Sequence, residues 1–151
     1  MSIEAKLAEL SLVLPPAVKP VAAYLPVRRS GDLLFVSGQL PMKDGKMMVT
    51  GKIPSSTGID NAAHAAEQCV LNALAAVKAE IGDLEKIKGV VRIGVFVQSD
   101  HTFAEQHLVA NGASELLGKL FGESGRHARA AVGVNSLPLN ASVEVEFLFQ
   151  L

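Results

Sequence analysis

The sequence has 151 residues, of which 49% are hydrophobic and 19% are charged, a balance that excludes a disordered or fibrous chain and allows one domain with a packed core. The formal net charge of −1, the single tyrosine and the absence of tryptophan disfavour bulk binding to nucleic acid or to anionic lipid. The lone Cys69 cannot form an internal disulfide, and the acidic first segment does not resemble a signal peptide, so we expect a cytoplasmic protein. No apolar run in the sequence approaches the roughly 20 residues that span a bilayer.

The first 15 residues are expected to form a helical extension of a single domain that covers residues 1–151. Apolar residues recur at helical spacing over residues 2–12, and the proline pair at 15–16 forbids continuation of that helix.

The next segment has the pattern of a β-hairpin. Apolar runs at 22–27 and 33–37 flank a polar turn, and Gly38 is expected to end the second strand. A second turn at 43–45 then leads to a short strand at 47–50.

The middle of the chain contains the clearest helix. An apolar stripe runs through residues 58–81, and Gly82 is a suitable stop for it. A strand at 87–98 follows, with Val91, Ile93, Val95 and Val97 expected on one face.

The last part of the chain completes an α+β domain. Ser99 or Asp100 is predicted to cap a second helix that reaches about Phe121 and is closed by Gly122. Final strands are predicted at 128–134 and 142–151, around a turn at 136–140. The predicted order is ββ(β)αβαββ, in which two helices can cover only one face of the sheet.

The other face of the sheet is expected to contact another subunit. The last strand directs one apolar row toward the helices, from Val143 to Leu151 at every second residue. The opposite face would carry Val90, Phe96 and Leu148. Apolar residues on an uncovered face predict an oligomer.

Most standard catalytic signatures are missing from the sequence. It contains no phosphate-binding Gly-rich loop with a lysine, no GxSxG, no HExxH and no CxxC. The four histidines do not fall at metal-ligand spacing, so no metal site is expected. Cys69 is interpreted as a small buried hydrophobe, and His64 as a hydrogen-bonded surface or interface residue.

Arg129 and Glu144 are the two candidate functional residues. Arg129 starts a strand of small residues, and Glu144 lies on the less apolar face of the last strand. Because a turn joins these strands, both side chains are expected to point the same way. Spacing alone allows either an ordinary salt bridge or a functional pair.

A resemblance to a known family rests on several motifs in order. SGQLP at 37–41 follows an apolar strand, and VVRIGVFVQS at 90–99 leads to the second helix. The most specific motif is ARAAVGVNSLPLNASVEVEF at 128–147, where an A-R-x-x-V context precedes L-P and a V-E-V-E strand. From about Tyr24 to its end, the sequence resembles the Rid/YjgF reactive-intermediate deaminase family, also labelled L-PSP endoribonuclease.

This resemblance implies a chorismate-mutase-like fold, with a mixed sheet backed by two helices, and a homotrimer with clefts between subunits. It implies that Arg129 holds the carboxylate of a 2-imino or enamino acid, for which a bidentate guanidinium is suited. Glu144 would activate a water that attacks the imine carbon, giving a 2-oxo acid and ammonia without a cofactor. The resemblance also implies a lining of the cleft by Tyr24, Gly38, Asn111 and the backbone of Ala131.

Three departures from the family pattern place the chain in a divergent branch. Ala131 stands where many members have a cysteine, and Ala22 and Ala23 replace a common Gly-Pro. The N-terminal helix and a longer loop around 42–54 are additional.

Other functions remain open at the level of the sequence. A non-catalytic trimer that binds small carboxylate metabolites would need Arg129 but would not need Glu144 to activate water. Ribonuclease or translation-inhibitor activity ranks last, because the charge balance provides little phosphate or base binding. Chorismate mutase activity is suggested by fold type alone, and fold does not determine function.

Overall fold

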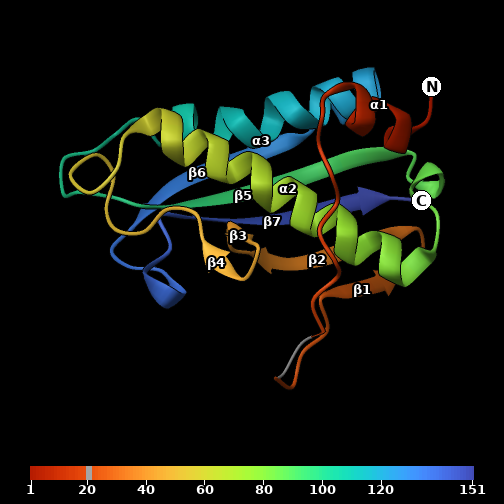
Figure 1. Cartoon of the computed structure of the whole chain (residues 1–151), viewed down its shortest axis with the longest axis horizontal. Coiled ribbons are helices and arrows are strands. Elements are labelled where there is room, and N and C mark those ends of the chain that lie inside the picture. The colour runs from red at the N-terminus through yellow and green to blue at the C-terminus, as the bar shows by residue number, and fades with distance from the viewer. Residues whose placement is uncertain (20–21) are drawn as a thin grey trace.

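A five-stranded sheet with two long helices on one face forms the body of the protein (Figure 1). The computed structural model describes residues 1–19 and 22–151. The strand order is β1-β2-β7-β5-β6; β5 and β6 are parallel and the other neighbouring pairs are antiparallel. The strands are β1 (Val27–Ser30), β2 (Leu33–Gln39), β5 (Gly89–Gln98), β6 (Ala128–Val134) and β7 (Val143–Gln150). The predicted α+β class with a mixed sheet is confirmed.

The first long helix, α2 (Ile59–Ile81), matches the prediction closely. It begins after Gly58 and ends at Gly82, whose φ of 82° suits a residue without a Cβ. Its face toward the sheet is fully buried and includes Cys69. Burial raises the pKa of the Cys69 thiol, and the charge of Glu144 adds to this effect. Cys69 is therefore the small buried hydrophobe that was expected.

The second long helix, α3 (Gln106–Phe121), begins later than predicted. Asp100 does not cap it, because the Asp100 carboxylate accepts hydrogen bonds from the backbone N–H (2.8 Å) and hydroxyl (2.9 Å) of Ser55. These hydrogen bonds connect the loop that contains Ser55 with the loop that contains Asp100. The N-cap residue of α3 is Glu105 instead. Gly122 closes the helix with a φ of 61°, as expected.

The two helices pack closely at Gly112. A Cβ at this position would overlap the carbonyl oxygen of Ala63 on α2. The absence of a side chain at Gly112 permits the backbones of α2 and α3 to approach each other. Gly118 lies six residues farther along α3, and a Cβ added there would have no neighbouring atom within 4 Å.

The hairpin at the start of the sheet is shifted from its predicted position. The strand predicted at 22–27 is wrong, because β1 begins at Val27 and contains Arg28 and Arg29. Ser30 pairs with Leu33 and leaves a two-residue turn, in which Gly31 has a φ of 57°. Gly38 does not end β2 but lies at an irregularity within it, between the pairs made by Val36 and Gln39.

The remaining short elements lie around the ends of the sheet. The strand predicted at 47–50 is shorter, since β3 (Met42–Lys43) and β4 (Lys46–Met47) form a small separate hairpin. Three 3-10 turns follow, named η1 (Leu84–Lys86), η2 (Gly122–Gly125) and η3 (Pro138–Asn140).

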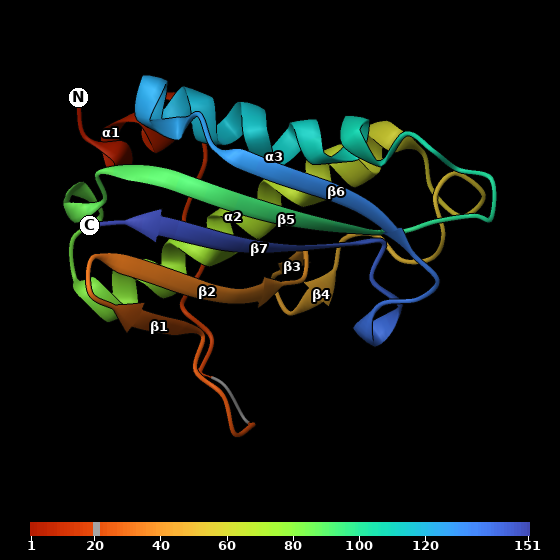
Figure 2. The same ribbon diagram turned by 180° about the vertical axis from the view of Figure 1, so that it is seen from behind.

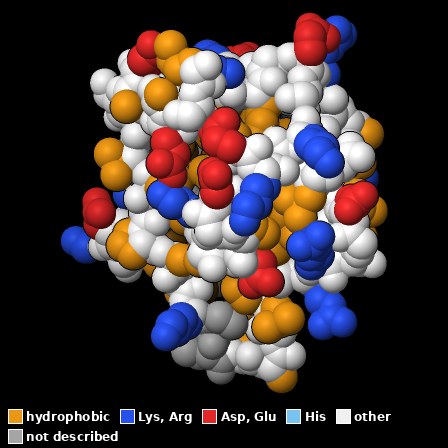
Figure 3. Space-filling view, turned by 90° about the vertical axis from the view of Figure 1, so that its right-hand side faces the viewer, with side chains coloured by type: hydrophobic (Ala, Val, Ile, Leu, Met, Phe, Trp, Pro, Cys, Tyr) orange, Lys and Arg blue, Asp and Glu red, His pale blue; other side chains and the backbone are white. Residues whose placement is uncertain are grey.

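The N-terminal extension folds back onto the domain. In α1 (Ile3–Glu9), Ser2 caps the first turn, and Ile3 and Leu7 are buried. The Lys6 ammonium donates to the carbonyl of Leu120 at the end of α3 (2.8 Å). Figure 3 views this end of the molecule and shows both acidic and basic side chains on its surface.

The helices leave the other face of the sheet uncovered (Figure 2), and this face is partly apolar. Phe35 and Val132 are 47% and 45% exposed, and Phe96 and Leu148 are half-buried. Val90 was expected on this face but is buried with the core, because a β-bulge between Val90 and Arg92 reverses the alternation there. Val91, expected among the core residues, is 38% exposed for the same reason.

Candidate functional site

Arg129 lies on the edge strand β6 and is held by α3. It is level with Ile93 of β5, whose side chain is fully buried on the helix side of the sheet. One guanidinium nitrogen, Nη1, donates to Asn111 Oδ1 and to Ser114 Oγ, both at 3.0 Å. The structure therefore brings together Arg129 and Asn111, two residues that the resemblance assigns to one cleft.

Ala131 lies two residues farther along β6 and shares this face of the sheet. It is level with the buried Val95 and packs against the core. Arg129, Asn111 and Ala131 form one group at the edge of the sheet, with Ser114 as an additional member. We call these four residues the arginine half-site.

His127 precedes this group on the chain. Its Nδ1 lies 3.1 Å from the carbonyl oxygen of Ala128. Burial lowers the pKa of the half-buried His127 imidazole and outweighs the contact with Ala128, which raises it; the positive charge of Arg129 lowers it further.

Glu144 lies on β7 and rests against Gly38 of β2. A Cβ at Gly38 would overlap the carboxylate oxygen Oε1 of Glu144. Burial raises the pKa of the Glu144 carboxyl, and the negative charge of Glu146 raises it further. We call Glu144 and Gly38 the glutamate half-site.

Glu146 repeats this arrangement one step along β7. Its Oε1 would lie 2.7 Å from a Cβ at Gly94, and it accepts a hydrogen bond from Arg92 Nη1 at 3.2 Å. Glu146 is thus neutralised by an arginine, whereas no ion pair involves Glu144 in the described residues.

The expectation that Arg129 and Glu144 point the same way is wrong. Strand β5 lies between their strands, with Arg129 level with Ile93 and Glu144 level with Phe96. Positions three residues apart on a strand face opposite sides of a sheet. Arg129 is on the side of the helices and Glu144 is on the open side, so one protomer does not bring these two side chains together.

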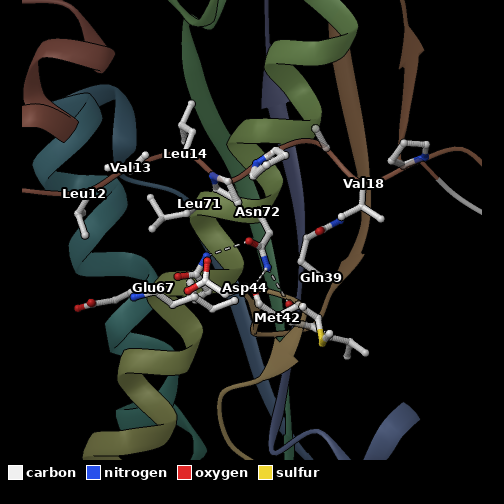
Figure 4. A pocket seen from close by; sticks show the side chains of 18 of the residues that line it. Leu12, Val13, Leu14, Val18, Gln39, Met42, Asp44, Glu67, Leu71 and Asn72 are labelled. Atoms are coloured by element: carbon white, nitrogen blue, oxygen red, sulfur yellow. Dashed lines mark hydrogen bonds between the residues drawn. The ribbon is translucent and has the colours of Figure 1, made fainter.

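Tyr24 lies in the irregular segment before β1 and is 59% exposed. Together with Gly38 it lines a cavity of about 920 Å³ between α2, the end of β2 and the segment 11–18 (Figure 4). Asn72 anchors the wall of this cavity, since its amide donates to the carbonyls of Leu40 (2.9 Å) and Met42 (3.1 Å).

Two features around the site, the cavity and Ser114, were not predicted from the sequence. The cavity depends on an N-terminal segment that folds back over α2, which no local pattern indicates. Ser114 could have been found from its position three residues after Asn111, because residues at that spacing share a helix face. His64, by contrast, lies on the surface as expected and pairs with Glu67 at 3.1 Å.

Neither a metal site nor a membrane-spanning helix occurs in the described residues. No group of three or more His, Cys, Asp or Glu side chains in residues 1–19 and 22–151 is placed to hold a metal ion. Over the same residues, no helix has both the length and the apolar character that crossing a membrane requires.

Comparison with known proteins defines the family. The model described as "YjgF/chorismate_mutase-like, putative endoribonuclease" matches residues 4–151. The chain therefore belongs to the YjgF/chorismate-mutase-like family, and its fold is the one that the motifs implied.

Particular relatives are similar over nearly the whole chain. Protein TCP17 of Trypanosoma cruzi is 44% identical over 99% of this chain and 94% of its own. A 2-iminobutanoate/2-iminopropanoate deaminase of Dermatophagoides farinae is 31% identical over 87% of this chain and 88% of its own. The crystal structure of Atu1372 from Agrobacterium tumefaciens superposes with a TM-score of 0.93 at 51% identity, covering 99% of this chain and 92% of that one.

Proposed function

We propose that this protein is a hydrolytic deaminase of reactive 2-imino or enamino acids, acting in clefts between the subunits of a homotrimer. The observation that carries the proposal is the division of the site residues into two half-sites on opposite faces of the sheet. A cleft between two copies can join the arginine half-site of one protomer to the glutamate half-site of the next. The similarity to a 2-iminobutanoate/2-iminopropanoate deaminase supports the reaction class.

The open face of the sheet supports the assembly. Exposed Phe35 and Val132, with half-buried Phe96 and Leu148, form an apolar surface that a second copy would cover. The Glu144 carboxylate opens onto the same side, so the surface that would bind the neighbour also carries one half of the site. Light scattering at micromolar concentration tests this step, and a stable monomer would remove the shared cleft.

The arginine half-site supplies recognition of the substrate carboxylate. Guanidinium and carboxylate are both planar and form two parallel hydrogen bonds, a geometry that lysine cannot reproduce. Because Asn111 and Ser114 fix one side of the guanidinium, the other side is free to bind. Binding of the carboxylate by Arg129 thereby holds the adjacent imine carbon in a fixed position.

The glutamate half-site supplies the base. A carboxylate whose pKa is raised by burial is a stronger proton acceptor than one in water. Glu144 takes a proton from a water as the water oxygen forms a bond to the imine carbon, and the C=N π bond breaks toward the nitrogen, which gains a proton. In the resulting carbinolamine the nitrogen gains a further proton and leaves as ammonia, while the hydroxyl loses its proton and becomes the carbonyl of the 2-oxo acid.

The test is to mix the protein with a threonine or serine dehydratase, which releases such intermediates, and to follow formation of the 2-oxo acid. Glu144→Gln should keep carboxylate binding but lose about 10²- to 10⁴-fold in the catalytic constant, which is the usual contribution of a positioned base. Glu146→Gln is the matched control, because Glu146 faces the same side but is paired with Arg92.

Two outcomes would overturn parts of the proposal. An equal loss in both glutamine variants would mean that strand polarity matters rather than Glu144 itself. If the wild type does not accelerate imine hydrolysis while Arg129→Ala abolishes pyruvate binding, the protein is the non-catalytic carboxylate binder that uses only the arginine half-site.

A further inference from the structure

Ser114 occupies an unusual position relative to the substrate-binding arginine. It lies three residues after Asn111 on the same face of α3 and is half-buried. Its hydroxyl oxygen and the Asn111 amide oxygen accept hydrogen bonds from the same atom, Arg129 Nη1, both at 3.0 Å.

These two contacts use the full donor capacity of that nitrogen. A guanidinium has five N–H groups in a fixed plane, and Nη1 carries two of them. With one proton directed at Asn111 and the other at Ser114, Nη1 has none left for a ligand. The edge formed by Nε and Nη2 retains three N–H groups, of which two are parallel and suited to a carboxylate.

We propose that Ser114 is a positioning residue that acts with Asn111 to present the Nε–Nη2 edge of Arg129 to the substrate carboxylate. This inference rests on the proposed function, because it concerns the same arginine. One acceptor would allow the guanidinium plane to rotate about the remaining hydrogen bond, whereas two acceptors fix it. An arginine on an exposed edge strand otherwise has many accessible rotamers, and ordering them on binding would reduce affinity.

The test compares pyruvate affinity by calorimetry in three serine variants. Ser114→Ala removes the acceptor and should weaken pyruvate binding about five- to tenfold, in the range of one typical hydrogen bond, because the effect on the ligand is indirect. Ser114→Thr keeps the hydroxyl and should restore most of the affinity. Ser124→Ala is the matched control, because the Ser124 hydroxyl lies just beyond α3 and donates to the Phe121 carbonyl (2.8 Å) without contacting Arg129.

The outcomes separate this inference from the proposed function. Loss of affinity in Ser114→Ala, with recovery in Ser114→Thr and no change in Ser124→Ala, supports the positioning role. If Arg129→Ala abolishes pyruvate binding but Ser114→Ala binds as the wild type does, the positioning role is overturned and the proposed function stands. If Arg129→Ala leaves the affinity unchanged, the carboxylate site itself is wrong. Melting temperatures of all variants, measured alongside, show whether a loss of affinity arises from unfolding.

Discussion

The carboxylate of Glu144 occupies the space that a Cβ at Gly38 would fill. The absence of a side chain at Gly38 therefore determines where the proposed base can lie. Gly38 does not have a positive φ, so an alanine there would be disfavoured by the contact alone and not by its backbone conformation.

Gly38→Ala should therefore displace the Glu144 carboxylate. Turnover should fall at least about 10²-fold, which is the usual effect of misplacing a catalytic group. Melting temperature should change little, because Gly38 is exposed. Pyruvate affinity should change little, because Arg129 rather than Glu144 is proposed to hold the carboxylate. Gly94→Ala provides the control, since it would push on Glu146 instead. Equal turnover in Gly38→Ala and the wild type would show that the position of Glu144 is unimportant.

The raised pKa of Glu144 predicts a dependence of stability on pH. Burial first, and the charge of Glu146 second, raise this pKa above the ordinary value of 4.5. The folded state therefore holds the proton more tightly than the unfolded state. The stability that this provides is complete below pH 4.5 and is lost as the pH rises through the folded-state pKa.

Urea unfolding of the wild type and of Glu144→Gln, at a series of pH values and one protein concentration, measures this effect. The free energy of unfolding of the wild type should fall relative to that of Glu144→Gln as the pH rises from below 4.5 toward neutrality. A difference that is constant across this range would mean that Glu144 titrates normally.

The contact between the two long helices predicts opposite effects for two glycines. Gly112→Ala should destabilise the protein by about 1–3 kcal/mol, because the added methyl group would force α2 and α3 apart at Ala63. Gly118→Ala, where the space is open, should stabilise it by about 0.5–1 kcal/mol by reducing the backbone entropy of the unfolded chain. Denaturant unfolding of both variants measures these changes in the free energy of unfolding. An increase in that free energy in Gly112→Ala would contradict the close approach of the helices.

Local sequence patterns predicted those parts of the fold that local chemistry determines. The helix from Ile59 to Ile81 has a continuous apolar stripe and a terminal Gly82, so its limits could be placed closely. The start of α3 could not, because the carboxylate of Asp100 forms its hydrogen bonds with Ser55, which is distant in sequence.

The site was predictable as a set of residues but not as an arrangement. The resemblance assigns Arg129 and Asn111 to one cleft, and their hydrogen bond needs only β6 and α3 to be neighbours. The relation between Arg129 and Glu144 depends on the register of both strands against β5, a long-range property that alternation within each strand cannot provide. The bulge beside Val90 is a similar case, since one extra residue reversed the side on which that valine lies.

The central claim is that a complete cleft takes Arg129 from one protomer and Glu144 from another. Co-expression of Arg129→Ala and Glu144→Gln chains with different affinity tags, followed by isolation of the mixed oligomers, tests it most directly. Each variant alone should be inactive in imine hydrolysis. In a mixed trimer, one of the three clefts would receive both native residues, so activity should return to about a third of the wild-type rate. Mixed oligomers as inactive as the single variants would contradict the account, because they would place both residues in the same protomer's site.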